Sequence, residues 1–162
     1  MDGEETRLYA SHHQFYVMDS EPTGNPGEPS FWTKEAFENR LAIGDGLLAV
    51  GTGTYGFVKV RVEHHQTEPL IDLTQWDHVT ECGLRVRSGL LLVEGCLSQS
   101  GLFFRVKPDQ YRVRACHANL AQSEQEVPAS WTGDFGDWYL VQFWPSESSM
   151  VEVLKERKHL SS

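Results

Sequence analysis

The amino-acid sequence predicts an all-β protein, an antiparallel β-sandwich of about eight or nine strands. Three observations support this fold class: short segments alternate apolar and polar residues with a period of two, turn-forming residues separate them, and helical spacing is rare. A flattened barrel is the alternative architecture. The chain has 162 residues and shows no linker or repeat, so we expect one β-sandwich domain spanning residues 1–162.

The first predicted strand covers residues 8–18, preceded by a terminus at residues 1–7 that we expect to be flexible. Residues 19–31 contain three prolines and form a predicted loop of unusual length. Thr33 is placed to cap one short N-terminal helix that continues to about Leu41.

Strands are predicted at residues 47–50 and 57–62, on either side of a Gly51–Gly56 segment with the pattern GxGxxG. A dinucleotide site needs a helix directly after such glycines, because the helix N-terminus faces the pyrophosphate. A period-two segment follows here instead. We therefore interpret the glycines as a tight hairpin between two strands and predict no cofactor.

The second half of the sequence alternates in the same way. Ser88-Gly89 is typical of a two-residue hairpin, and Pro108 is suited to a turn. The capping-box pattern Ser149-x-x-Glu152 indicates a possible C-terminal helix, with residues 155–162 flexible. The strands predicted here cover residues 76–80, 82–87, 90–95, 102–106, 111–117 and 138–144.

The composition excludes several functional classes. Fourteen Lys and Arg stand against 23 Asp and Glu, and the resulting net charge of −9 disfavours general nucleic-acid binding on electrostatic grounds. No apolar run is long enough to predict a membrane span, and the acidic N-terminus lacks a signal core, so we expect a cytoplasmic protein. Three cysteines without CxxC spacing suit reduced thiols in that compartment.

Charge follows the predicted strands. Cationic residues alternate with apolar ones, which predicts a cationic solvent face on the strands. Carboxylates are concentrated in three stretches that lack Lys and Arg. A solvated surface explains this pattern, and so does an acidic edge that docks a basic partner. The cationic pairs are Lys59 with Arg61, Arg85 with Arg87, Arg105 with Lys107, and Arg112 with Arg114.

The sequence contains no recognised catalytic signature. Four residues could form a polar cluster: His13, Gln14, His78 and His117. Their spacing does not show that they converge, and tandem histidines on a strand point to opposite faces. We therefore predict no metal site, and satisfied or surface histidines are the simpler interpretation. An enzyme that uses these histidines is the least supported functional class.

Five segments carry a resemblance to a known family: Ser11–Val17, Trp32–Ala36, Asp45-Gly46, His78–Leu84 and Pro108–Val113. They resemble the competence protein J family, small bacterial proteins known as inhibitors of a competence-associated DNA-entry nuclease. The resemblance implies a non-enzymatic protein-binding role with a nuclease or a toxin as partner. The 19–31 loop, the 118–135 stretch and the C-terminal tail look like additions to the family pattern.

The leading hypothesis combines this resemblance with the charge pattern. Loop carboxylates would pair with cationic residues around the partner's active site and occlude it, while aromatic residues supply buried anchors. A small-molecule or carbohydrate-binding sandwich with stacking tryptophans is the alternative, and the oligomeric state stays open. The predicted partner-binding residues are Glu124, Glu126, Trp131, Asp134, Phe135, Asp137 and Trp138.

Overall fold

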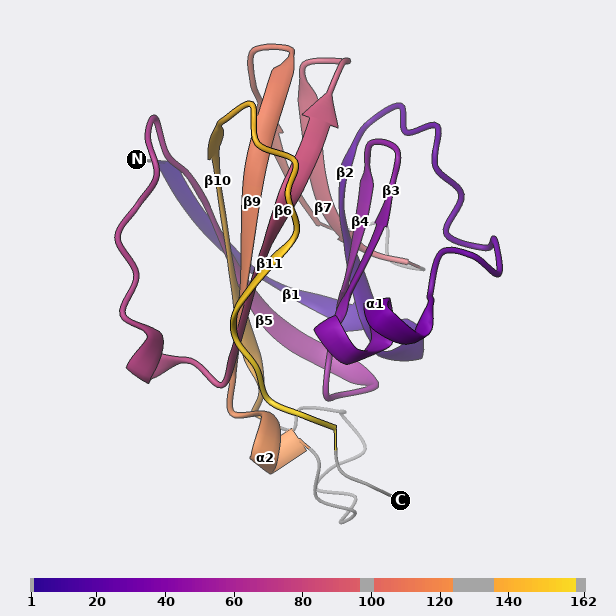
Figure 1. Ribbon diagram of the computed structural model, residues 1–162, viewed down its shortest axis with the longest axis vertical. Helices are drawn as coiled ribbons and strands as arrows, with labels where there is room; N and C mark the ends of the chain where they lie inside the picture. The colour runs from indigo at the N-terminus through magenta and orange to yellow at the C-terminus, as the bar shows by residue number, and fades with distance from the viewer. Residues whose placement is uncertain (1, 97–100, 124–135, 160–162) are drawn as a thin grey trace.

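The computed structural model describes residues 2–96, 101–123 and 136–159, which form two β-sheets (Figure 1). Sheet A has the strand order β1-β5-β10-β9-β6-β11, and sheet B has the order β3-β4-β2-β7-β8. The all-β sandwich is confirmed. Sheet A contains β1 (Asp2–Ala10), β5 (Gly56–His64), β10 (Trp138–Pro145), β9 (Asp109–Ala118), β6 (His78–Val86) and β11 (Glu152–Lys155). Sheet B contains β3 (Leu41–Gly44), β4 (Leu47–Gly51), β2 (Gln14–Asp19), β7 (Leu90–Gly95) and β8 (Gly101–Arg105).

The main hydrophobic core is built from the inward faces of both sheets. On β5, Val58, Val60 and Val62 are buried while the residues between them are exposed or half-buried, as period-two alternation requires. From sheet B, Phe15 reaches Tyr139 of β10, with ring centroids 5.6 Å apart in an edge-to-face contact. Burial of these faces is the main favourable term in folding.

Strand pairing is antiparallel throughout the described sheets except between β10 and β5, which run parallel. This parallel pair is a local departure from the antiparallel pairing that the sequence predicted. β10 lies between β5 and β9 and pairs with β9 in the antiparallel sense. Because β5 and β10 are far apart in the sequence, no tight turn forces them to run in opposite directions.

Two turns predicted as hairpins instead connect the two sheets. The Gly51–Gly56 segment leads from β4 of sheet B to β5 of sheet A, and Ser88-Gly89 leads from β6 of sheet A to β7 of sheet B. A turn residue marks where the chain reverses, but it does not determine which strands then pair. A two-residue hairpin that does occur joins β3 and β4 through Asp45-Gly46, with Gly46 at φ +71°.

The predicted strand at residues 8–18 is divided in two. β1 already begins at Asp2 and pairs with β5 along its whole length, so residues 2–7 form a strand where we expected a flexible terminus. The chain leaves sheet A after Ala10 and enters sheet B at Gln14 through a 3-10 turn, η1 (Ser11–His13). His12 and His13 both have φ of 59° in this turn, a left-handed conformation that is uncommon outside glycine.

Helix α1 (Lys34–Asn39) begins as predicted, because the Ala36 N–H donates to Thr33 Oγ1 at 3.0 Å. It ends two residues earlier than expected. Arg40 adopts a left-handed conformation with φ of 57°, and Leu41 then begins β3, a strand that the sequence did not predict. Two further short elements were not predicted, the 3-10 helix η2 (Leu73–Gln75) and helix α2 (Leu120–Ser123).

The C-terminal segment forms a strand where the capping-box pattern predicted a helix. β11 pairs with β6 and crosses the front of sheet A in Figure 1. The unpaired edge of β6 and the side chain of Arg112 provide hydrogen-bond partners for an extended segment at this place. Residues 155–159, expected to be flexible, continue toward α1 and contact it. In the described part of the chain, no helix has the length and apolar character needed to cross a membrane.

Candidate functional site

Most of the predicted partner-binding residues fall between residues 124 and 135, outside the described residues. Asp137 is described and lies in a different environment from the one predicted. It is buried, and its carboxylate accepts hydrogen bonds from the Thr54 hydroxyl, the Thr54 N–H at 3.2 Å and the Tyr139 hydroxyl. Asp137 therefore fixes the turn between β4 and β5 through both of its carboxylate oxygens.

Trp138 is half-buried on the outer face of sheet A. Its ring lies 4.9 Å from that of Trp76, and the Lys59 ammonium lies over it at 4.8 Å from the centroid. Such a cation–π contact favours a fixed position for the lysine. Trp138 thus belongs to a mixed aromatic and cationic surface.

The predicted polar cluster divides into two pairs. His78 and His117 lie opposite each other on β6 and β9, with ring centroids 5.0 Å apart. His13 and Gln14 lie at the junction of β1 and β2 and line a separate hollow. The four residues therefore do not form one site.

His78 connects helix α1 to the C-terminal segment. Its Nε2 donates to the Asn39 carbonyl at 2.8 Å, and its Nδ1 accepts from the Arg157 N–H at 3.0 Å. Burial lowers the pKa of His78 to about 4, and the nearby charge of Arg40 acts in the same direction. The neutral imidazole is the form that can make both hydrogen bonds.

His117 is fully buried, and within the described residues neither ring nitrogen has a hydrogen-bond partner. Its ring contacts those of His78 and Tyr139 edge to face. Burial lowers its pKa well below the ordinary histidine range, with His78 and Arg40 contributing. These contacts suit a packing role for a neutral imidazole, because a buried charge here would be strongly disfavoured.

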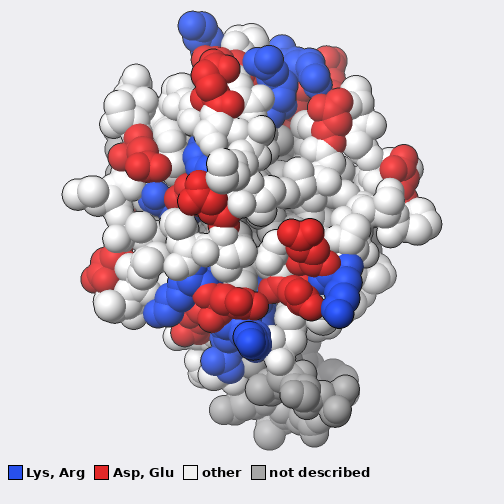
Figure 2. All heavy atoms as spheres, viewed as in Figure 1, with Lys and Arg blue, Asp and Glu red and all other residues white. Residues whose placement is uncertain are grey.

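The cationic pairs do not all form a solvent face. Lys59, Arg85 and Arg87 are exposed, as are Arg105 and Lys107, and Arg61 is half-buried. Arg112 and Arg114 are buried, which contradicts the prediction for β9. On the face seen in Figure 2, acidic and basic side chains lie side by side, and neither sign gathers into a separate region.

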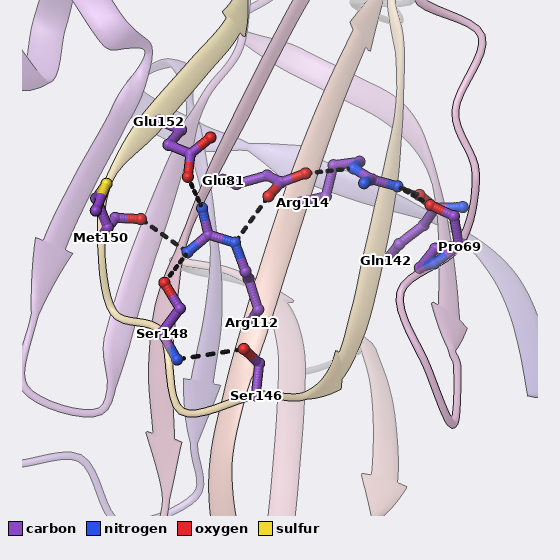
Figure 3. Close-up of polar contacts among 9 residues, drawn as sticks. All are labelled: Pro69, Glu81, Arg112, Arg114, Gln142, Ser146, Ser148, Met150 and Glu152. Carbon is purple, nitrogen blue, oxygen red and sulfur yellow. Dashed lines mark hydrogen bonds and ion pairs between the residues drawn. The ribbon is translucent and has the colours of Figure 1, made fainter.

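Arg112 and Arg114 share the buried carboxylate of Glu81 (Figure 3). Each Nε donates to a different oxygen of Glu81, at 2.7 Å in both cases. Arg112 also binds the Met150 carbonyl at 2.7 Å and Glu152 at 3.2 Å, which ties the segment before β11 to the sheet. These arginines are covered by segments remote in the sequence, the one before β11 and the loop at Pro69, so alternation alone could not show their burial.

The same polar row extends across sheet A. Arg114 donates to Gln142 Oε1 at 2.9 Å, and Gln142 Nε2 donates to Glu63 at 3.0 Å. Burial by itself raises the pKa of Glu63, but hydrogen bonds from Gln142, Arg61 and His65 outweigh it and lower the pKa to about 2. The row joins β6, β9, β10 and β5, and it stiffens the face without forming an open site.

A hollow of about 570 Å³ lies where the β1–β2 turn meets α1 and the C-terminal segment. We call it the histidine hollow. Trp32 donates through Nε1 to Gln14 Oε1 at 2.8 Å, and the Phe37 and His159 rings stack with centroids 4.0 Å apart. Its size is within the range of ligand pockets. The lining residues are His12, His13, Gln14, Trp32, Phe37, Arg40, Gly51, Thr52, Gly53 and His159.

The sequence pointed to only part of this hollow: His13 and Gln14 in the predicted polar cluster, and Trp32 among the stacking tryptophans of the small-molecule alternative. It gave no signal for Phe37, Arg40 or His159, which come from α1 and the C-terminal end. Arg40 is buried and donates through Nε and Nη2 to the Arg157 carbonyl, at 3.4 and 3.3 Å. Arg40 takes the left-handed position after α1, where glycine is usual, and only the structure shows this.

The molecule belongs to the class of all-β sandwiches, because it packs a six-stranded sheet against a five-stranded one with crossovers between them. Other proteins of this class have solved structures. No protein-family model and no curated protein matches the chain. Solved structures do match it, and they define the fold.

The crystal structure of ComJ, the inhibitor of the DNA-degrading activity of NucA from Bacillus subtilis, is similar with a TM-score of 0.66 and 17% sequence identity. The match covers 88% of this chain and 96% of that one. A structure described as Crocagin biosynthetic gene J matches with a TM-score of 0.55 and 17% identity, covering 91% of this chain and all of that one. The resemblance to the competence protein J family is thus confirmed in the fold.

Proposed function

We propose that this chain is a non-catalytic protein-binding β-sandwich that inhibits a nuclease or a toxin by occluding it. The observation that carries the proposal is the shared fold with ComJ over nearly the full length of both chains. Fold alone does not define function, so the site must supply further support.

The described residues support binding better than catalysis. His78 and His117 are buried and have lowered pKa values, and each is engaged in packing or backbone contacts. The histidine hollow, in contrast, is open and lined by aromatic rings, which are the side chains that contribute most at protein interfaces. We assign the hollow to the partner-facing side of the molecule.

The acidic segment at residues 124–135 is the second part of the proposal. Glu124, Glu126 and Asp134 carry its charge, and occlusion would use these carboxylates against cationic residues of the partner. The described residue on its C-terminal side, Asp137, binds Thr54, next to Gly53 of the hollow. The aromatic residues of the histidine hollow and the carboxylates of the acidic segment would then bind the same partner. A cytoplasmic location completes this proposal.

The test is inhibition of DNA cleavage. Purified chain is titrated against NucA and against nucleases fractionated from the native host, with plasmid degradation as the readout. We expect cleavage by at least one nuclease to fall to a low level near one equivalent of inhibitor, with a complex visible by size-exclusion chromatography. Full cleavage at a large excess, with no complex in any fraction, would overturn the proposal.

A second candidate function, small-molecule binding, is favoured by the size and aromatic lining of the histidine hollow. Ligands that bind only the folded state raise the melting temperature, because they stabilise that state by RT ln(1 + L/Kd), where L is the free ligand concentration. A thermal-shift screen with sugars and nucleotides separates the two functions. Stabilisation that is lost in Trp32→Ala would support small-molecule binding, and no shift with any compound would exclude those classes.

A further inference from the structure

Exposed aromatic side chains gather where β1 and β5 meet the turn before β5. Tyr9 and Phe57 stand opposite each other in register, with ring centroids 5.1 Å apart and edge to face. Tyr55 joins them at 6.2 Å from Tyr9. The exposed fractions are 38% for Tyr9, 45% for Tyr55 and 39% for Phe57. We call these three residues the aromatic surface.

Cations lie next to the aromatic surface on the same face. Arg7 and Lys59 also stand opposite each other in register, one step along the two strands. The Arg7 guanidinium lies over the Phe57 ring at 5.3 Å from its centroid, and Lys59 lies over Trp138 at 4.8 Å. The carboxylate of Glu5 is one step further away, opposite Arg61. Arg7 and Lys59 thus place two cations beside the aromatic surface, in a chain that carries a net charge of −9.

The backbone at the edge of the aromatic surface is strained. His12 and His13 both adopt left-handed conformations, and both imidazoles contact Tyr55, at 5.7 and 5.4 Å between centroids. Such conformations cost free energy and are concentrated at functional sites. Because His12 and His13 also line the histidine hollow, the aromatic surface and the hollow are continuous.

We propose that the aromatic surface is the docking site for an acidic protein segment. An apolar or aromatic side chain of the segment packs against Tyr9 and Phe57, and neighbouring carboxylates pair with Arg7 and Lys59. This inference rests on the proposed function, because the segment belongs to the protein that the chain binds. Tyrosine, phenylalanine and arginine together are typical of the energetically dominant part of an interface.

A single-stranded nucleic acid also binds aromatic residues beside cations. The net charge of −9 opposes a polyanion more strongly than it opposes a short segment whose few carboxylates are paired locally. The observations therefore favour a protein segment, and nucleic acid becomes an outcome of the test.

The experiment uses labelled probes that need no identified partner. Binding of a short peptide of alternating Glu and Tyr is measured by fluorescence anisotropy, next to a peptide with Lys in place of Glu and an oligothymidylate. The chain is studied as wild type and as the variants Phe57→Ala and Lys59→Glu. Phe103→Ala is the matched control, since Phe103 is 60% exposed on β8 of the opposite sheet.

We expect the acidic peptide to bind the wild type and to lose about ten-fold or more in affinity in Phe57→Ala, with no change in Phe103→Ala. Lys59→Glu should shift the preference toward the basic peptide. Failure of the acidic peptide to bind, an equal loss in Phe103→Ala, or preferential binding of the oligothymidylate would each overturn the inference.

Melting curves verify that the variants are folded, and Arg7→Glu provides a second charge reversal if Lys59→Glu is unstable. The nuclease assay separates the two proposals. Inhibition that survives in Phe57→Ala and Arg7→Glu refutes this docking site and leaves the proposed function intact. Loss of inhibition in the same variants, with Phe103→Ala unaffected, supports both.

Discussion

Glu81 of β6 stands directly opposite Arg114 of β9, and its Oε2 accepts a hydrogen bond from Arg114 Nε at 2.7 Å. The other carboxylate oxygen accepts from Arg112 at the same distance. One buried acid therefore holds two buried arginines, and Arg112 in turn holds the segment before β11 (Figure 3). This row holds the start of the C-terminal segment against sheet A, and from there the segment continues through β11 to α1 and the histidine hollow.

The first prediction concerns this row. Replacing Glu81 with Gln leaves two buried guanidinium groups without their shared carboxylate, and loss of one partner from a buried ion pair costs about 3–5 kcal/mol. We expect urea unfolding to show a loss of that size. Glu152→Gln is the control, because its side chain is 48% exposed and exposed pairs contribute about 0–1 kcal/mol. Similar losses in both variants would contradict a central role for Glu81.

The sequence predicted the positions of most strands, but it did not predict which of their polar side chains are buried. Lys59 and Arg61 on β5 alternate with valines in the same way as Arg112 and Arg114 on either side of Val113, yet only the second pair is buried. The difference arises from the segments that pack over β9, namely β11 and the loop whose Pro69 carbonyl binds Arg114. Periodicity shows which face of a strand is apolar, but it does not show which other segments of the chain cover the polar face.

The candidate site, too, could be predicted only in part, because local sequence patterns do not show which distant segments come together. Turn residues correctly marked chain reversals, but the choice between a hairpin and a crossover depends on which sheet accepts the next strand. The C-terminal residues carried a helical signal and became β11, because β6 offered an unpaired edge. His159 reaches the histidine hollow through this strand, so no local pattern could place it there.

The second prediction concerns pH. The pKa of His78 is about 4 in the folded chain and near 6.5 when unfolded, so the unfolded state binds the proton first as pH falls. Stability contributed by neutral His78 is complete above pH 6.5 and decreases toward pH 4. The upper bound for this loss is about 3 kcal/mol.

Denaturant unfolding at a series of pH values measures this loss. His78→Gln should reduce the slope of stability against pH in this window, while His117 keeps its own contribution because its pKa is also lowered. His13→Gln, at an exposed histidine, controls for the loss of an imidazole. An unchanged slope in His78→Gln would show that its side chain does not stay neutral in the folded state.

The third prediction distinguishes a structural Asp137 from a partner-binding one. Its carboxylate accepts hydrogen bonds from Thr54 and Tyr139, so Asp137→Ala leaves buried donors unsatisfied. Each such group costs about 1–3 kcal/mol, and we expect a marked drop in the melting temperature. Asp72→Ala, at an exposed residue that caps η2, should change it far less. A stable Asp137→Ala protein with impaired inhibition would return Asp137 to the partner surface.

The fourth prediction concerns thiol reactivity. Burial raises the pKa of Cys82 and of Cys116 to about 12, and the thiolate is the reactive form. Cys96 is only half-buried, and its thiol donates to the Ser11 carbonyl beside the strained histidine turn. We expect one thiol to react rapidly with a disulfide reagent in the native chain and three to react in denaturant.

The variant Cys96→Ser identifies which thiol reacts and should leave the native chain unreactive on the same time scale. Because Cys96 adjoins the β1–β2 turn, its modification also reports on the histidine hollow. If a partner covers that turn, the complex should react more slowly than the free chain. Rapid labelling of Cys82 or Cys116 in the native state would instead show that sheet A opens locally, since neither sulfur is accessible in the closed sandwich.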